Sequence, residues 1–151
     1  MRFRGEHNQR VDDKCRLSIP SAFRQLLETH GDPRLVLVKA LRTRCLQAFT
    51  VPEWEAREDL LMKLPASDPV VQNILRFQVA SAQMVEPDSH GRIVLAPALR
   101  TYAGIAAQTD AVVIGQVQRF EVWSGEAWTA EQNRIVETMS DWDQRIAALG
   151  L

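Results

Sequence analysis

The feature that most constrains the fold is a segment that occurs twice in the 151-residue chain. One copy runs from Asp12 to Arg24 (DDKCRLSIPSAFR) and the other from Asp88 to Arg100 (DSHGRIVLAPALR). At a constant offset of 76 positions, the first Asp, the following Arg, the apolar positions and the last Arg are all in register. Solenoid repeats usually span about 20–50 residues, so this longer period predicts a duplicated small domain.

The similarity between the halves continues beyond this segment. Apolar residues 35–38 align with residues 111–114 at the same offset. After a two-residue shortening, residues 46–56 align with residues 120–130. A half of this length would have only a marginal core by itself. We therefore predict that the two halves pack together as a pseudo-symmetric pair.

Local patterns predict the order of elements in the first half. Phe3 to Val11 is expected to be a strand, whose even-numbered positions carry Arg2, Arg4 and Arg10 on one face. Residues 12–15 are predicted to form a turn and residues 16–19 a second strand. Pro20 is expected to begin a short helix that Gly31 can end.

Further strands and helices are expected after that helix. Residues 35–38 and 46–49 are predicted strands, and Thr50 with Glu53 matches a capping box for a helix to about residue 63. Residues 67–69 are expected to cap another helix. Its predicted inward side chains are Val70, Val71, Ile74 and Leu75.

The last predicted helix carries an apolar seam. Its members are Ile135, Met139, Trp142, Ile146 and Leu149, at alternating steps of four and three. Core inside one chain is the favoured interpretation of this seam, and a contact between subunits is the alternative. The four tryptophans, at positions 54, 123, 128 and 142, are interpreted as packing residues and not as platforms for stacked bases.

Composition and charge exclude several classes. The net charge is −1, but residues 1–24 carry net +3 and residues 121–145 carry net −4, so a nucleic-acid surface is expected at the first end. No run of about 18 apolar residues predicts a membrane span, and no signal peptide pattern opens the chain. The cytoplasm is the expected compartment. Two cysteines and three histidines lack ligand spacing, so no metal or cofactor is predicted.

The repeated Asp-x-x-x-Arg turn allows two interpretations. The Asp could cap the turn and pair with the Arg on the surface, which is common and contributes little. Alternatively, a narrow two-stranded ribbon could enter the major groove and present a protruding Arg at the tip of the turn to bases and phosphates. The basic residues around the first turn favour the second interpretation. The candidate DNA contacts are Arg2, Arg4, Arg10, Lys14, Arg16 and Arg92, and the candidate structural residues of the turns are Asp12, Asp88 and Gly91.

The sequence gives little support for catalysis. Its acidic residues have no partner arrangement that marks a nucleophile or a general base. No glycine-rich phosphate loop is present. We therefore predict that the chain is not an enzyme.

The residues match the pattern of a known family. Phe3-Arg4-Gly5, the first turn with Ile19-Pro20 and Phe23-Arg24, the second turn with Gly91-Arg92, Trp54, and Glu121-Val122-Trp123 together resemble the MraZ family over essentially the whole chain. The resemblance implies an α+β fold of two tandem SpoVT–AbrB-like swapped-hairpin domains that form a pseudo-symmetric barrel with flanking helices. The implied divisions are residues 1–52, 53–80, 81–126 and 127–151.

The same resemblance implies a function. MraZ-like proteins are cytoplasmic, nucleoid-associated transcriptional regulators that bind double-stranded DNA at direct repeats upstream of the division and cell-wall gene cluster, often as repressors. Their protomers assemble into rings. The alternative from another class is an oligomeric interaction scaffold that does not read DNA.

Four positions depart from the family pattern. Cys15 replaces the usual turn Gly, and a non-Gly residue is costly at positive φ, so the first turn is expected to differ in shape. Ser89 and His90 replace more typical residues of the second turn, where Lys14 has no basic counterpart. Pro97 is shifted by one position relative to Pro20.

Overall fold

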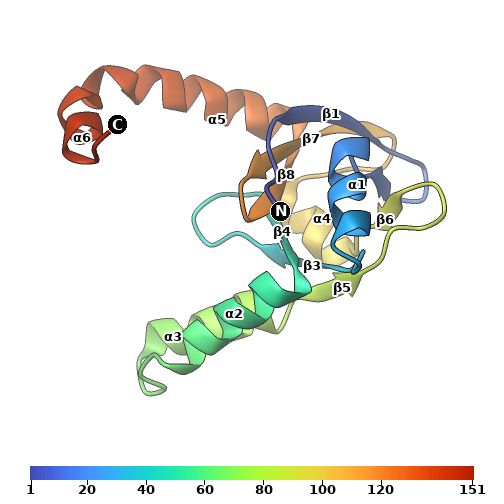
Figure 1. Cartoon of the computed structure of the whole chain (residues 1–151), viewed down its shortest axis with the longest axis horizontal. Helices are drawn as coiled ribbons and strands as arrows, with labels where there is room; N and C mark the ends of the chain where they lie inside the picture. The colour runs from blue at the N-terminus through green and yellow to red at the C-terminus, as the bar shows by residue number, and fades with distance from the viewer.

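The computed structural model describes residues 1–151, with eight strands and six α-helices (Figure 1). The strands are β1 (Glu6–Val11), β2 (Arg16–Ser18), β3 (Leu35–Lys39), β4 (Leu46–Thr50), β5 (Gln83–Val85), β6 (Arg92–Val94), β7 (Thr109–Gln116) and β8 (Arg119–Ser124). The helices are α1 (Ser21–Thr29), α2 (Val51–Met62), α3 (Pro69–Ile74), α4 (Pro97–Ala103), α5 (Gly125–Thr138) and α6 (Asp143–Ala148), with a π-helical turn η1 (Leu75–Val79) and a 3-10 turn η2 (Met139–Asp141).

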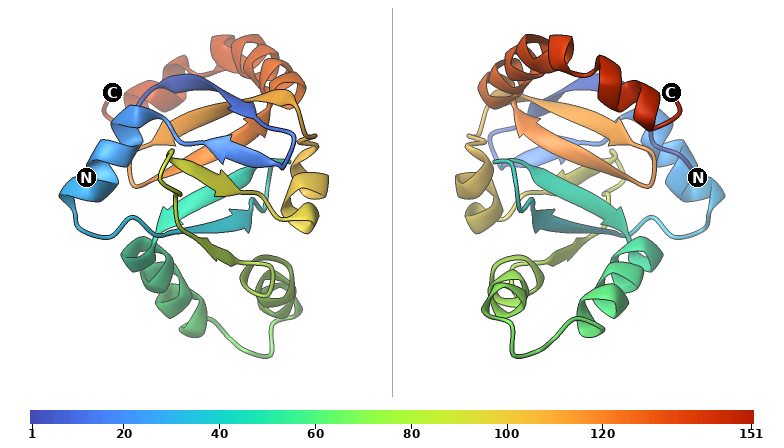
Figure 2. Two further views of the ribbon diagram at one scale, coloured as in Figure 1. Left: turned by 90° about the vertical axis from the view of Figure 1, so that its right-hand side faces the viewer. Right: turned by 90° about the vertical axis from the view of Figure 1, so that its left-hand side faces the viewer.

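All eight strands belong to one antiparallel sheet in the order β5-β3-β4-β8-β7-β1-β2-β6. The sheet curls into a nearly closed barrel, and the helices lie outside it (Figure 2). The two halves exchange strands within this sheet. β1 of the first half pairs with β7 of the second, whereas β5 of the second half pairs with β3 of the first.

The predicted duplication is confirmed by the positions of matching elements. β2 and β6 begin 76 residues apart and pair with each other, and α2 and α5 begin 74 residues apart. The hydroxyls of Thr50 and Ser124 cap these two helices by accepting bonds from the backbone N–H groups of Glu53 and Ala127. The predicted α+β fold of two tandem hairpin units in a pseudo-symmetric barrel is therefore confirmed.

The halves share one hydrophobic core. It contains 19 buried residues that come from both halves. Three aromatic rings, Phe3, Phe23 and Phe120, lie at its centre with centroids 5.0–5.2 Å apart. Because Phe3 and Phe120 come from opposite halves of the chain, neither half can bury this cluster by itself.

The predicted strand from Phe3 to Val11 needs a correction. β1 begins only at Glu6, because Gly5 has a φ of +94° and interrupts the extended backbone. Phe3 instead forms an isolated bridge with Val117 in the turn between β7 and β8. Arg2 and Arg4 are nevertheless exposed on either side of buried Phe3, like the even-numbered residues of β1, although they lie outside the strand.

The helices after β4 also differ in detail from the expectation. Only the Thr50 half of the capping box forms, since the Glu53 carboxylate does not return a bond to the Thr50 N–H. Asp68 caps α3 through the Val70 N–H, as predicted. Val70 is 63% exposed and Val71 is 5% exposed, so the prediction that Val70 points inward is wrong.

The C-terminal seam is not part of the core. Met139, Trp142, Ile146 and Leu149 are all exposed, and η2 breaks the predicted helix between α5 and α6. The favoured interpretation of an intramolecular seam is therefore wrong. Among the tryptophans, Trp54 and Trp123 are buried as predicted, and Trp142 is the exception.

The helices α2 and α3 form one arm that extends from the barrel, and α5 and α6 form a second (Figure 1). None of the helices combines the length and the apolar run that a bilayer crossing requires.

Candidate nucleic-acid interface

The first repeated turn is organised by Asp12. Its Oδ1 accepts bonds from the backbone N–H groups of Lys14 (2.9 Å) and Arg16 (2.8 Å). Its Oδ2 accepts a bond from Arg16 Nε at 2.6 Å. The Asp12 N–H donates to the Arg16 carbonyl and the Cys15 N–H donates to the Asp12 carbonyl, so the chain reverses between β1 and β2.

The second turn repeats this geometry. Asp88 Oδ1 accepts from the N–H groups of His90 (2.9 Å) and Arg92 (3.0 Å), and Oδ2 accepts from Arg92 Nε at 3.1 Å. The backbone bonds from Asp88 to Arg92 and from Gly91 to Asp88 are the counterparts of those in the first turn. Asp12 and Asp88 therefore accept equivalent bonds from the backbone N–H groups of their own turns.

The hydrogen bonds to each aspartate favour its charged form. The pKa of Asp88 is lowered from 3.8 to about 2, mainly by the backbone N–H of Arg92 and further by the Arg92 side chain. The pKa of Asp12 is lowered as well, with the Arg16 N–H as the largest cause. Both turns therefore keep their aspartates charged at neutral pH.

The two turns lie side by side. β2 pairs with β6, so that Ser18 faces Arg92 and Arg16 faces Val94 across the ladder. Backbone bonds join the turns reciprocally, from the Ile19 N–H to the Gly91 carbonyl and from the Leu95 N–H to the Cys15 carbonyl. Diagonal positions on a ladder are about 7–8 Å apart, so Arg16 and Arg92 present their side chains on one outward face.

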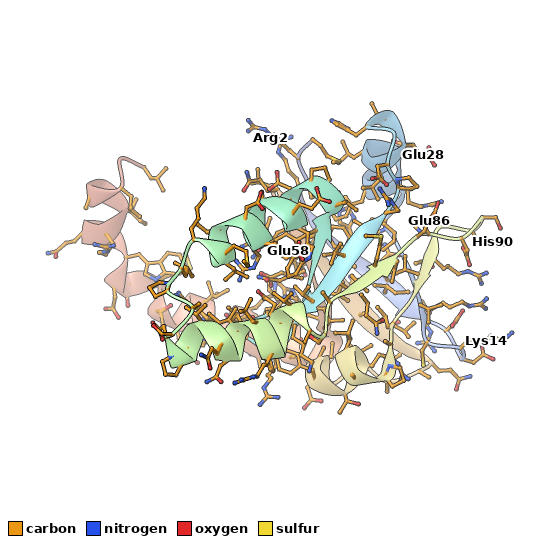
Figure 3. The ribbon with its side chains drawn as sticks, turned by 90° about the horizontal axis from the view of Figure 1, so that it is seen from below. Arg2, Lys14, Glu28, Glu58, Glu86 and His90 are labelled. Carbon is orange, nitrogen blue, oxygen red and sulfur yellow. The ribbon has the colours of Figure 1, made fainter.

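The tips of the turns carry different residues from those expected. Lys14 and His90 are exposed and project from the same side of the molecule (Figure 3). Arg16 and Arg92 sit at the base of each turn, with side chains only 26% exposed. The expectation of a protruding Arg at the tip is therefore wrong, because the bond to Asp folds each Arg back toward its own turn.

The two motif arginines differ in how many donors remain free. Arg16 contacts Asp12 through Nε, and its terminal amino groups have no acceptor in the protein. Arg92 contacts Asp88 through Nε and Nη2, and its Nη1 lies 3.8 Å from Asp12 Oδ2. Arg16 thus offers more of its guanidinium to an external anion than Arg92 does.

Cys15 and Gly91 occupy equivalent positions, with φ values of +60° and +75°. The expectation that Cys15 changes the shape of the first turn is wrong, since the turn keeps the backbone bonds of its counterpart. A Cβ at Gly91 would lie 2.4 Å from Cδ of Arg24, so a side chain at this position would require the Arg24 side chain to move.

Sequence reasoning assigned no role to the last Arg of each copy. Arg24 Nε donates to the Ile19 carbonyl at 3.2 Å, and Arg100 Nε donates to the Leu95 carbonyl at 3.0 Å. Their common offset of 76 was the available signal. These two side chains support the strands that carry the turns.

The other three candidate arginines are not gathered at the turns. Arg10 is near the first turn, but its exposed side chain pairs with Asp110 at 3.3 Å. Arg2 and Arg4 precede β1 and lie roughly 20 Å or more from the turn along the strand. Figure 3 shows Arg2 well apart from Lys14. The basic N-terminal segment therefore does not form one continuous patch.

Comparison with known proteins identifies relatives over the full length. The model of the family described as "MraZ protein, putative antitoxin-like" matches residues 2–77 and 79–148. The chain belongs to the MraZ family. MraZ is thus the family that the paired turns and the Glu121-Val122-Trp123 segment predicted. In that segment, Trp123 Nε1 donates to Glu121 Oε2 at 2.6 Å inside the structure.

Several relatives carry the name "Transcriptional regulator MraZ". The protein of Hydrogenovibrio crunogenus is 34% identical over 99% of this chain and 98% of its own length. The Coxiella burnetii protein is 36% identical over 93% of this chain and 92% of its own. The Halorhodospira halophila protein is 37% identical over 97% of this chain and 90% of its own length. Their name describes a regulatory and not an enzymatic role, in agreement with the prediction for this chain.

Proposed function

We propose that this protein is a sequence-specific transcriptional regulator that binds double-stranded DNA through its paired turns. The observation that carries the proposal is the unsatisfied guanidinium edge of Arg16 beside the exposed Lys14. Asp12 orients Arg16 without using its terminal amino groups. Those groups can form a bidentate contact with guanine or with a phosphate. The names of its relatives support the regulatory role.

A single protomer is a weak DNA ligand. Each motif arginine has an aspartate beside it, and Arg10 is paired with Asp110, so little uncompensated positive charge remains at the turns. Phosphate contacts are also weakened by salt. The proposal therefore requires several protomers that engage several sites, because linkage can raise avidity by about 10²–10⁴.

The proposed assembly is a homo-oligomeric ring of identical chains on direct repeats. Apolar side chains are exposed on both arms, and a second copy of the chain is the proposed occupant. On the α2–α3 arm these are Leu60, Met62 and Val70, and on the α5–α6 arm they are Val136, Met139 and Leu149. Soluble homo-oligomers usually form closed symmetric assemblies, and their subunit contacts bury such apolar surfaces. Several turns would then face one DNA molecule.

The proposed targets are direct repeats upstream of the protein's own division and cell-wall gene cluster, which it represses from the nucleoid in the cytoplasm. The test is fluorescence anisotropy with DNA that carries one, two or three of these repeats, with scrambled DNA as control. We expect affinity to rise steeply with repeat number and to fall when half a helical turn is inserted between repeats. Equal affinity for scrambled DNA would contradict the proposal.

The second candidate function is an oligomeric scaffold that does not read DNA. The exposed apolar arms and the compensated charge at the turns favour it. Multi-angle light scattering alone does not separate the two functions, because both predict assembly. A reporter driven by the protein's own promoter separates them, since only the regulator changes its output.

A further inference from the structure

A polar pocket lies on the outer face of β4 and β8, away from the paired turns. It has a volume of about 460 Å³ and is lined by residues of β4 and β8, the β3–β4 loop, β7 and α2. In the sheet order β4 and β8 are central and β2 and β6 are at one end, so the pocket and the turns occupy different sides of the barrel. The β3–β4 loop beside the pocket lies between the two arms (Figure 1).

Three arginines, Arg42, Arg57 and Arg119, line this pocket and form no ion pair with any carboxylate of the chain. The only acid among the lining residues is Glu121. Its Oε2 already accepts bonds from Trp123 Nε1 and from the Cys45 thiol. The pocket therefore carries an excess of positive charge that the folded chain does not neutralise.

Arg119 is held in place with unused donors. β4–β8 pairing sets it opposite Phe49, and its guanidinium lies 5.7 Å from the centroid of that ring. Its Nε is buried and has no hydrogen-bond partner. A buried donor without an acceptor costs free energy, and such donors in native proteins are few. An acceptor from outside the chain would remove this cost.

Arg57 reaches the pocket from α2 and is also fixed in direction. Its Nε and Nη2 both donate to Gln78 Oε1, at 2.8 and 2.6 Å, and Gln78 Nε2 donates to the Lys39 carbonyl. Burial, and then the charge of Arg119, lower the pKa of the Arg57 guanidinium. The guanidinium groups of Arg57 and Arg119 thus repel each other electrostatically, while their contacts with Gln78 and Phe49 hold them at the pocket.

We infer that this pocket is a binding site for a small phosphate-bearing anion. Arg guanidinium groups match the geometry of phosphate oxygens and bind them in bidentate fashion. The volume lies within the range of small-molecule sites, about 300–1,000 Å³. The site is independent of the proposed DNA contact, since it uses neither Lys14 nor Arg16.

The test is calorimetric titration of the full chain with inorganic pyrophosphate at constant ionic strength. We expect saturable binding that Arg119→Gln weakens by at least about tenfold, since it removes charge-assisted hydrogen bonds. Arg42→Gln should also weaken binding, and this exposed loop position keeps the test valid if Arg119→Gln fails to fold. The matched control is Arg76→Gln, an exposed charge in η1 outside the pocket, which should change affinity by less than about threefold.

Four results of the anion titrations and of a mass measurement would overturn the inference, and a DNA titration adds a fifth. The four are no saturable heat with the wild-type chain, equal weakening by Arg76→Gln, tighter binding of malonate than of pyrophosphate, and no pyrophosphate binding together with a changed assembly mass for Arg119→Gln. The last result would assign the arginines to a contact between copies. A DNA titration of Arg119→Gln is run in parallel. Loss of DNA affinity without pyrophosphate binding would assign them to DNA and also reject the site.

Discussion

The two turns have the same backbone hydrogen bonds but present different chemistry. In the first, Lys14 is at the tip and Arg16 keeps two amino groups free. In the second, His90 is at the tip and Arg92 is held by Asp88 and lies near Asp12. A duplicated fold must keep the residues that shape each turn, but its tips are free to diverge. If the proposed DNA contact is made through the turns, the first turn is expected to contribute more to it than the second.

The largest expected effect is that of Arg16→Ala on DNA binding. Loss of one bidentate contact should cost about 1–3 kcal/mol per turn, and the loss is multiplied across an assembly. Specific binding should therefore disappear in an anisotropy titration while circular dichroism stays unchanged. Arg134→Ala on α5, which removes an exposed Arg that pairs with Glu131 and not with a turn residue, is the control. If Arg16→Ala bound DNA with unchanged affinity, the first turn could not be the DNA contact that distinguishes it from the second.

Gly91→Ala should destabilise the fold by about 1–2 kcal/mol, because Ala is disfavoured at positive φ. The new Cβ would also clash with the Arg24 side chain, which would have to move. The measurement is the urea midpoint of unfolding. Gly104→Ala, which has a similar φ but open space around its Cβ, is the control and isolates the contribution of Arg24. Equal losses in both variants would remove Arg24 from the explanation.

Arg92→Ala should weaken DNA binding less than Arg16→Ala, by under about tenfold, or about 1.4 kcal/mol. The reason is that its Nε and Nη2 already bind Asp88 and its Nη1 lies near Asp12, so fewer of its donors are free than in Arg16. Titration of both variants against the same DNA measures the ratio directly. If the Arg92 variant lost as much affinity as the Arg16 variant, the two turns would be equivalent readers.

Cys15→Gly should be neutral or stabilise the protein by about 0.5–1 kcal/mol, since φ at this position is +60°. It is the reciprocal of Gly91→Ala at the equivalent position. Thermal unfolding at neutral pH measures the effect. A clear loss of stability or of DNA affinity would show that the thiol itself has a role.

The smallest expected effect is a pH dependence of the second turn. Because the pKa of Asp88 is lowered to about 2, its stabilising bonds are complete above about pH 4 and are lost as the pH falls toward 2. The difference in urea midpoint between the wild type and Asp88→Asn should therefore shrink over that range. A difference that is independent of pH would mean that the charge of Asp88 does not matter.

Much of the fold was predictable because the repeat is visible without any structure. Asp12 and Asp88, the β2 and β6 strands and the caps of α2 and α5 follow from local patterns at fixed offsets. The pairing of Arg16 with Asp12 was one of two alternatives that the sequence left open, because the spacing does not show whether the Arg bonds to the Asp or projects from the turn. The prediction for the C-terminal seam was wrong because an apolar pattern indicates that a helix face is suited to packing. It does not show whether that face packs within the same chain or against another one. The arginine pocket has no motif at all, since β4–β8 pairing and α2 packing bring Arg57 and Arg119 together from positions 62 residues apart.

The exchange of strands between the halves also sets the timing of folding during synthesis. β1 pairs with β7 across 98 to 108 positions, so the first strand made has no partner on that edge until residues 109–116 have left the ribosome. At about 5–20 residues per second, this interval is roughly 5–20 s. Throughout it, the nascent chain exposes an open strand edge, and the ring of Phe3 lacks its contact with Phe120. A chaperone that protects the first hundred residues would therefore act on this protein during its most aggregation-prone period.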